Sequence, residues 1–132
     1  MSGLASSITA AQASAVALGA AVGALLRWWA GLAFNGLWAG FPLGTLLVNA
    51  VGGLLIGVAM VWFTRSPHEL LRLLLVTGLL GGFTTFSAFS LDTLTLYERG
   101  QPGVAAAYVA GSVVLSLAAI VAGIHAARGI WL

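Results

Sequence analysis

The sequence predicts an all-α membrane protein with four transmembrane helices. Three observations support this: the composition, four long apolar stretches, and the short polar breaks between them. Of the 132 residues, 61% are hydrophobic and 6% are charged, whereas an ordinary soluble domain is about 25% charged. Five arginines and three acidic residues cannot cover the surface of a soluble protein of this size. Lipid is therefore the expected solvent for most of the surface, and the length suits one compact unit, residues 1–132.

The charge pattern and the composition exclude several classes of protein. The pI is about 10.0, but the arginines are scattered singly, so the chain has no basic stripe for nucleic acid. The absence of cysteine excludes disulfides, thiol catalysis and Cys-ligated metals. No nucleophile–base pair, paired carboxylates or metal-ligand cluster occurs at a workable spacing, so the sequence does not predict an enzyme.

Four stretches are long enough to cross a bilayer, whose core of about 30 Å needs roughly 20 apolar residues in a helix. They lie at about residues 13–34, 44–63, 70–97 and 104–127. The first ends in Trp28, Trp29 and Phe34, which is typical of an interfacial aromatic belt. Polar segments with proline and glycine, residues 65–69 and 98–103, end the second and third spans.

Four spans place both termini on the same side of the membrane. Three arginines flank that side and two lie towards the other, so the positive-inside rule only weakly favours cytoplasmic termini. Such a shallow bias fits a protein that inserts in both orientations and pairs antiparallel. On these charges alone, a single orientation fits as well.

The first span contains a charged residue, Arg27. A charge within a span marks a functional site by default, although snorkelling to the interface beside Trp28 and Trp29 is the simpler interpretation. The first and second spans each contain glycines four residues apart, a spacing suited to tight helix contact: Gly19 and Gly23, and Gly53 and Gly57.

The second span contains one strongly polar side chain, Asn49. A side-chain amide in hydrocarbon is costly unless it is hydrogen-bonded. Asn49 therefore either binds a neighbouring helix or donates its amide hydrogens to an anion in transit.

The middle of the third span contains two adjacent glycines, Gly81 and Gly82, followed by Thr84 and Thr85, all poor helix formers. A helix break here would release carbonyl oxygens near the membrane midplane, as in cation sites at discontinuous helices. The alternative is that the glycines only allow close helix packing. The local sequence favours neither.

Phe86 and Phe89 follow at a spacing that places both rings on one helix face. Such rings usually face lipid or core, but here they stand among hydroxyl groups that lipid would leave unsatisfied: Thr84, Thr85, Ser87 and Ser90. The positive edges of the rings could then line a path for a small anion. Asp92, further along, could lie in a water-filled mouth.

The fourth span aligns three hydroxyl groups, Tyr108, Ser112 and Ser116, on one stripe. Hydroxyl groups donate and accept hydrogen bonds and rotate to follow a moving ion. Serines also bond back to helix carbonyls, so the stripe could instead be structural. Spacing alone therefore predicts a path for a small ion, most simply an anion.

Three of these segments resemble the CrcB/Fluc family of bacterial fluoride channels. They are residues 23–28, residues 42–49, and above all residues 78–90 with the pattern Gly-Gly-x-Thr-Thr-Phe-Ser-x-Phe. The length and the layout of four spans match too, so the resemblance covers nearly the whole chain. Ala88, where the family often has threonine, and Asp92, at an acidic position that is sometimes glutamate, depart from the family pattern.

The resemblance implies an antiparallel, dual-topology homodimer in the bacterial inner membrane, with two pores at the subunit interface. It also implies a central structural Na⁺ held by the backbone carbonyls of Gly81 and Thr84 from both subunits. The implied fluoride path contains Asn49, Thr85, Phe86, Ser87, Phe89, Tyr108, Ser112 and Ser116, with Arg27 as the family's first-helix arginine.

The function expected on this basis is passive export of fluoride, which reduces its toxicity. The alternative is a small four-helix, dual-topology multidrug transporter. Such a pump needs a carboxylate within the membrane, and the first three-quarters of the predicted spans contain none, which counts against it. A purely structural subunit would leave the hydroxyl stripe unexplained.

Overall fold

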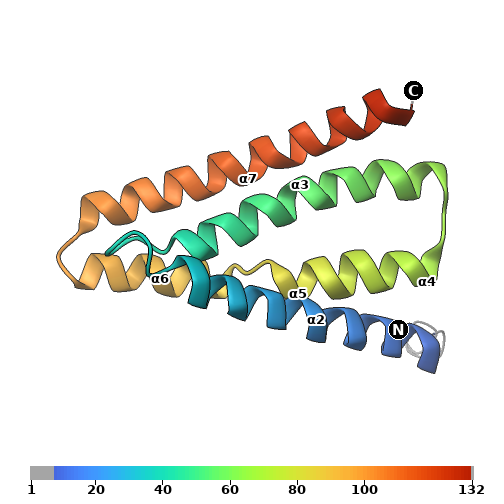
Figure 1. Cartoon of the computed structure of the whole chain (residues 1–132), viewed down its shortest axis with the longest axis horizontal. Helices are drawn as coiled ribbons and strands as arrows, with labels where there is room; N and C mark the ends of the chain where they lie inside the picture. Colours follow the sequence, from blue (N-terminus) through green and yellow to red (C-terminus); the bar gives the residue numbers. More distant parts are fainter. Residues whose placement is uncertain (1–7, 132) are drawn as a thin grey trace.

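The computed structural model describes residues 8–131, so residues 1–7 and 132 of the expected single unit lie outside the described residues. Within that range the chain is all-helical, and its spans run side by side (Figure 1). Three spans are unbroken: α2 (Ala10–Phe34), α3 (Leu43–Arg65) and α7 (Pro102–Trp131). The third span has four parts: α4 (Glu69–Arg72), the π-helical η1 (Leu73–Leu80), α5 (Gly81–Phe83) and α6 (Ser87–Glu98).

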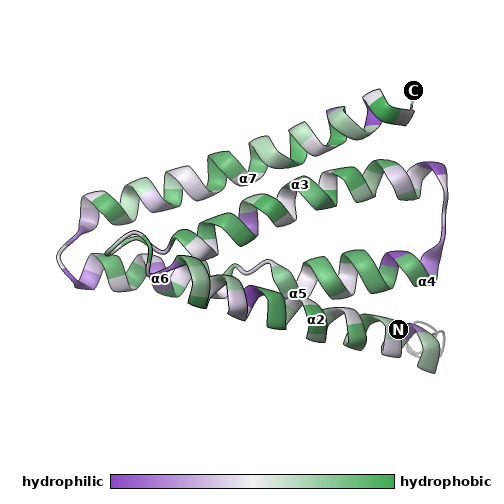
Figure 2. Ribbon diagram, viewed as in Figure 1, coloured by the Kyte–Doolittle hydropathy of each residue, from purple (hydrophilic) through white to green (hydrophobic). Residues whose placement is uncertain are grey.

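Each of the four spans is long and apolar enough to cross a membrane. In Figure 2 the hydrophobic colour runs along the helices, while hydrophilic residues gather at the turns and ends. The predicted multi-pass, all-helical fold is therefore confirmed. The helices extend slightly beyond the expected limits at nearly every end, because capping residues and fraying turns are poorly defined by hydropathy alone.

Local chemistry explains where the first two long helices begin. Thr9 and Gln12 form a reciprocal capping box at the start of α2. The residue before α3 is Pro42, which offers no side-chain cap. Instead Asn35 reaches across the loop, and its Oδ1 accepts from the amides of Gly44 at 2.7 Å and Thr45 at 3.3 Å. Asn35 therefore satisfies two amides that the helix itself leaves free.

The helices pack as two close pairs, and glycines form both contacts. Helix α3 runs parallel to α7 (Figure 1), and a Cβ atom on Gly53 would lie 2.9 Å from the carbonyl oxygen of Ser116. Helix α2 packs against the third span, where a Cβ atom on Gly23 would overlap the carbonyl oxygen of Leu79. Small residues let the backbones approach in this way, as the glycine spacing predicted.

The third span departs most from regular geometry. Its π-helical stretch, Leu73–Leu80, leads into α5, and the helix is then interrupted over residues 84–86 before α6 begins. Thr84 has extended backbone angles, φ −84° and ψ 157°. The predicted break is therefore present, and it lies at the middle of the Glu69–Glu98 span (Figure 1).

Candidate ion pathway

At the interruption, two backbone amides that would donate to carbonyls in a continuous helix donate to side-chain oxygens instead. In a regular helix the amide of Thr85 would donate to the carbonyl of Gly81; here it donates to Oδ1 of Asn49 at 2.8 Å. Likewise the amide of Ala88, the regular partner of the Thr84 carbonyl, donates to Oγ1 of Thr85 at 3.1 Å. The carbonyl oxygens of Gly81 and Thr84 thus lose their regular helical donors.

Asn49 makes a second bond to the same residue. Its Nδ2 donates to the carbonyl oxygen of Thr85 at 2.9 Å. The structural interpretation of Asn49 therefore holds, since its amide binds the neighbouring span. The functional interpretation is not removed, because a primary amide has two N–H donors and this bond uses one.

The two glycines before the interruption serve different purposes. A Cβ atom on Gly82 would lie 2.5 Å from the carbonyl oxygen of Ala20, so Gly82 allows α2 to pack closely. At Gly81 the nearest atom to such a Cβ is the carbonyl oxygen of Val76, at 3.7 Å, so helix packing does not require this glycine. Break and packing, which the sequence left as alternatives, therefore occur together.

A groove of about 590 Å³ lies beside the interruption, between the third span and the α3–α7 pair. It brings together most of the proposed pore residues from three separate spans. Its walls contain Asn49 from α3, Gly81, Thr84, Thr85, Phe86 and Phe89 from the third span, and Ser112 and Ser116 from α7.

The hydroxyl of Ser112 is the most informative polar group in this groove. Ser112 is only 5% exposed, and its Oγ has no hydrogen-bond partner among the described residues. It does not bond back to a helix carbonyl, which was the structural alternative for this serine. A buried hydroxyl without a partner is costly, so a ligand is expected to meet it.

Phe86 and Phe89 stand at the edge of the groove in different surroundings. Their ring centroids are 5.8 Å apart with planes tilted by 46°. Phe86 is 79% exposed, whereas Phe89 packs against the buried ring of Tyr108, with centroids 5.3 Å apart. Phe89 is therefore held by packing within this chain, whereas Phe86 is largely exposed.

Four of the proposed site residues lie outside the groove: Tyr108, Ser87, Arg27 and Asp92. Tyr108 is fully buried, and its hydroxyl donates to Oδ2 of Asp92 at 3.1 Å, so the predicted stripe divides between Tyr108 and the two serines. Ser87 is exposed, with its Oγ 3.5 Å from Oγ1 of Thr85. Arg27 does not snorkel away from the protein as the simpler interpretation expected: its Nε donates to the carbonyl oxygen of Gly82 at 3.0 Å.

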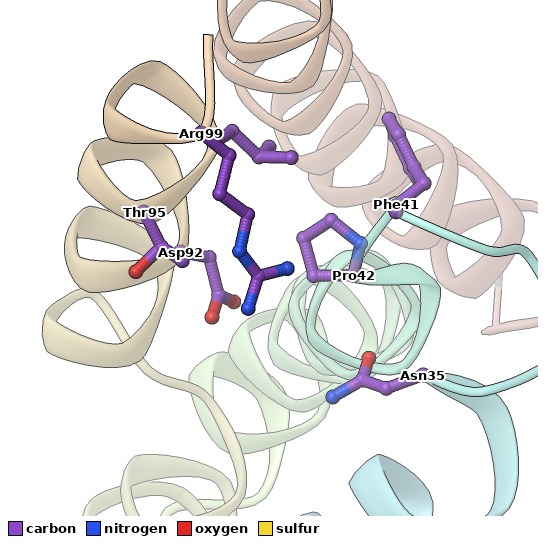
Figure 3. A pocket seen from close by; sticks show the side chains of 8 residues that line it. Asn35, Phe41, Pro42, Asp92, Thr95 and Arg99 are labelled. Atoms are coloured by element: carbon purple, nitrogen blue, oxygen red, sulfur yellow. The ribbon is translucent and has the colours of Figure 1, made fainter. Parts of the chain in front are cut away.

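Asp92 lines a second, smaller cavity of about 210 Å³ near the turns at residues 35–42 and 99–101. Figure 3 shows Asp92 and Arg99 directed into this cavity, with Pro42 and Asn35 on the other side. Asp92 thus lines a small cavity beside these turns, and its carboxylate accepts a hydrogen bond from the hydroxyl of Tyr108.

Two residues that shape the site were missed by the sequence reasoning. Asn35 holds the start of α3, and no local pattern links it to amides nine and ten residues away. Gly52 faces the interruption, and a Cβ atom there would overlap Cγ2 of Thr84. The sequence held one signal for Gly52. Its neighbour Gly53 pairs with Gly57 to form the α3–α7 contact, so Gly52 lies on another face and needs a different reason to be glycine.

These features define a class. Four apolar spans, an interrupted helix and a mainly apolar groove that contains a few polar side chains are the features of a small multi-pass membrane protein. Residues 14–124 match the family described as "CrcB-like protein, Camphor Resistance (CrcB)". The chain therefore belongs to the CrcB family, whose curated members reported next are ion channels and not enzymes.

Curated relatives support this membership over most of the chain. A protein of Paracoccus denitrificans is 50% identical over 116 residues, which is 88% of this chain and 94% of the relative. One of Cereibacter sphaeroides is 53% identical over 115 residues (86% and 92%), and one of Rhizobium etli is 48% identical over 122 residues (90% and 98%). All three carry the name "Fluoride-specific ion channel FluC".

Proposed function

We propose that this chain forms a fluoride-selective channel that lets fluoride leave the cytoplasm passively. The ion is named from the relatives, which are called fluoride-specific channels at about 50% identity. The observation in the structure that carries the proposal is the unpartnered, buried hydroxyl of Ser112 in the same groove as Asn49. A groove with donors on both walls suits an anion that must exchange water for protein groups.

The groove offers donors without a fixed positive charge among its lining residues. Fluoride is small and strongly hydrated, so its path must supply N–H and O–H groups, here from Asn49, Thr85, Ser112 and Ser116. Ring edges of Phe86 and Phe89 add weak positive potential. Because conduction requires binding that is weak enough for release, hydroxyl groups and ring edges are better suited than an arginine.

A second copy of the chain is needed to complete this path. The face that contains the interruption exposes Phe86 and Ser87, whereas the hydroxyl of Ser90 already donates to the carbonyl oxygen of Phe86 at 2.9 Å. Lipid cannot satisfy the freed carbonyls of Gly81 and Thr84. We therefore propose that this face is covered by its counterpart, with one fluoride path on each side of the twofold axis.

The proposed arrangement is antiparallel. The interruption lies at the middle of its span, so an inverted copy would bring its own interruption to the same depth. The carbonyls of Gly81 and Thr84 from both copies could then surround a small cation, and carbonyl oxygen is a suitable ligand for Na⁺. Bound Na⁺ would supply positive charge to hold the four carbonyls together.

Passive export follows from the chemistry of fluoride. It enters a cell as the neutral acid and is trapped as the anion in a less acidic cytoplasm, so a channel in the cytoplasmic membrane lets it leave down its gradient. This reduces the toxicity of fluoride without energy input.

The experiment is a release assay from liposomes containing the purified protein. Fluoride should leave much faster than from empty liposomes, while chloride is retained. Equal release of the two anions, or none, would contradict the proposal. Single cysteines introduced at the two ends of the molecule test orientation, because only an antiparallel pair cross-links one end to the other.

The multidrug transporter is not retained. Such a pump needs a carboxylate free to exchange protons with a cationic substrate, and Asp92 accepts a hydrogen bond from Tyr108 away from the large groove. Family membership points the same way.

A further inference from the structure

Arg27 is a charged residue within the spans to which the proposed fluoride path assigns no role. It does not line the groove. Its Nε donates to the carbonyl oxygen of Gly82 at 3.0 Å, in a partly buried position. Gly82 lies between Gly81 and Thr84, whose carbonyls form the proposed cation site.

The glycine stripe of α2 brings Arg27 to this place. Gly19, Gly23 and Arg27 follow one another at intervals of four residues, so they share one face of α2. The two glycines lie so close to the third span that a Cβ atom on either would overlap a backbone oxygen, Leu74 O or Leu79 O. The side chain of Arg27 therefore lies against α5, where its Nε reaches the carbonyl oxygen of Gly82.

The carbonyl that Arg27 binds is itself orphaned by the interruption. In a continuous helix the carbonyl of Gly82 would accept from the amide of Phe86, but Phe86 lies within the interruption, directly before α6. An unpaired carbonyl within a span is costly. Arg27 therefore satisfies a carbonyl that the interruption frees.

We propose that Arg27 is the positioning residue of the cation site. By holding Gly82 towards α2 it fixes the peptide groups on either side of it, so that the Gly81 and Thr84 carbonyls remain directed to the open face. The inference rests on the proposed Na⁺ site. It assigns to Arg27 a role in cation affinity and not in fluoride contact.

The geometry requires arginine and not merely a positive charge. The bond is made by Nε, which lies along the side chain before its end and donates sideways in the plane of the guanidinium group. Lysine has no donor at that point, and its terminal ammonium is a point charge on a longer flexible stem. Arg27→Lys should therefore lose the positioning while keeping the charge.

The first experiment reads the Thr84 carbonyl directly. The sequence contains a single Thr-Thr pair, Thr84 and Thr85, so protein made with ¹³C-carbonyl, ¹⁵N-labelled threonine gives one carbonyl–amide correlation in solid-state NMR of proteoliposomes. Addition of Na⁺ should shift it in the wild type. In Arg27→Lys the half-saturating Na⁺ concentration should rise by about tenfold or more, as expected for the loss of one charge-assisted hydrogen bond.

Exposed Arg72 provides the matched control. Arg72→Lys should leave the half-saturating Na⁺ concentration unchanged within about twofold, a range of a few tenths of a kcal/mol. If Arg27→Lys binds Na⁺ as tightly as the control, the proposal is overturned. If instead the wild type shows no Na⁺ shift at all, the cation site fails, and that result is recognisable without any variant.

A second measurement needs no variant and therefore does not depend on how a variant folds. Glycine labelled with ¹³C at the carbonyl and phenylalanine labelled with ¹⁵N mark two peptide bonds only, Gly40-Phe41 and Gly82-Phe83. With ¹⁵N at arginine Nε as well, the Gly82 carbonyl should show dipolar coupling to an arginine, and the Gly40 carbonyl should not. Absence of coupling at both would overturn the contact on which the proposal stands.

Discussion

The side-chain amide of Asn49 and the peptide groups of Thr85 form a reciprocal pair. Oδ1 of Asn49 accepts from the Thr85 amide at 2.8 Å, and Nδ2 donates to the Thr85 carbonyl at 2.9 Å. One side chain of α3 thus pairs with both backbone groups of Thr85 at the interruption. The pair explains why an amide is present within an apolar helix, since a primary amide offers both an acceptor oxygen and an N–H donor.

Replacing Asn49 by leucine should therefore damage both stability and conduction. Both backbone groups of Thr85 would lose their partner, and each orphaned buried group costs about 1–3 kcal/mol. The melting temperature in detergent should fall clearly, and fluoride release from liposomes should slow by about tenfold or more. Gln101, an exposed amide in the last turn, is the control: Gln101→Leu should change neither. An Asn49→Leu protein as stable as the wild type would rule out the bracing role.

Much of this fold could be predicted from the sequence because hydropathy and span length are strong signals. The polar residues of the groove could also be found, since Asn49, Ser112 and Ser116 have few reasons to occur in lipid-facing helix. Adjacent glycines followed by two threonines left an interruption and close helix packing as equal alternatives. Each of these inferences used local composition alone.

Other features depend on partners distant in the sequence, and local patterns could not give them. Tyr108 shares a helix face with Ser112, yet its longer side chain reaches Asp92 on another span. Arg27 was more simply read as snorkelling, because its acceptor is a backbone carbonyl 55 residues away. The π-helical stretch Leu73–Leu80 had no signal, since leucine and valine accept either helical form.

Replacing Ser112 by alanine should slow fluoride release without lowering the stability of the protein. Its hydroxyl is buried without a partner, so Ser112→Ala removes an unsatisfied group and should raise the melting temperature slightly or leave it unchanged. Fluoride release should nevertheless fall, because a donor in the groove is lost. Ser14→Ala, on the exposed face of α2, is the control for both measurements. Should Ser112→Ala conduct like the wild type, the groove wall on α7 is not part of the path.

Tyr108 and Asp92 should be energetically coupled. The hydroxyl–carboxylate bond of 3.1 Å joins α7 to α6, and residues in direct contact typically show interaction energies of about 0.5–3 kcal/mol. Tyr108→Phe and Asp92→Asn should each destabilise the protein to guanidinium or heat, and the double variant should be less destabilised than the sum of the two. If the destabilisation of the double variant equals the sum of the two single ones, the Tyr108–Asp92 hydrogen bond contributes nothing to stability. Arg99→Gln removes the positive charge of Arg99 from the cavity in Figure 3. Its stability, measured in the same way, shows whether that charge contributes independently of the Tyr108–Asp92 bond.

Glycine should be required at position 52 because the side chain of Thr84 lies directly against it. A Cβ atom at position 52 would overlap Cγ2 of Thr84, whereas at Gly111, within α7, it would meet nothing within 4 Å. Alanine is favoured over glycine within a helix by about 1 kcal/mol, so Gly111→Ala should be neutral or stabilising, while Gly52→Ala should weaken both Na⁺ binding and fluoride release. Thr84→Ser removes the methyl group but keeps the hydroxyl that bonds to Leu80. The double variant Gly52→Ala, Thr84→Ser should therefore recover most of the release rate in the liposome assay. If Gly52→Ala is harmless, or if the serine gives no recovery, the close approach of these two residues does not set the shape of the interruption.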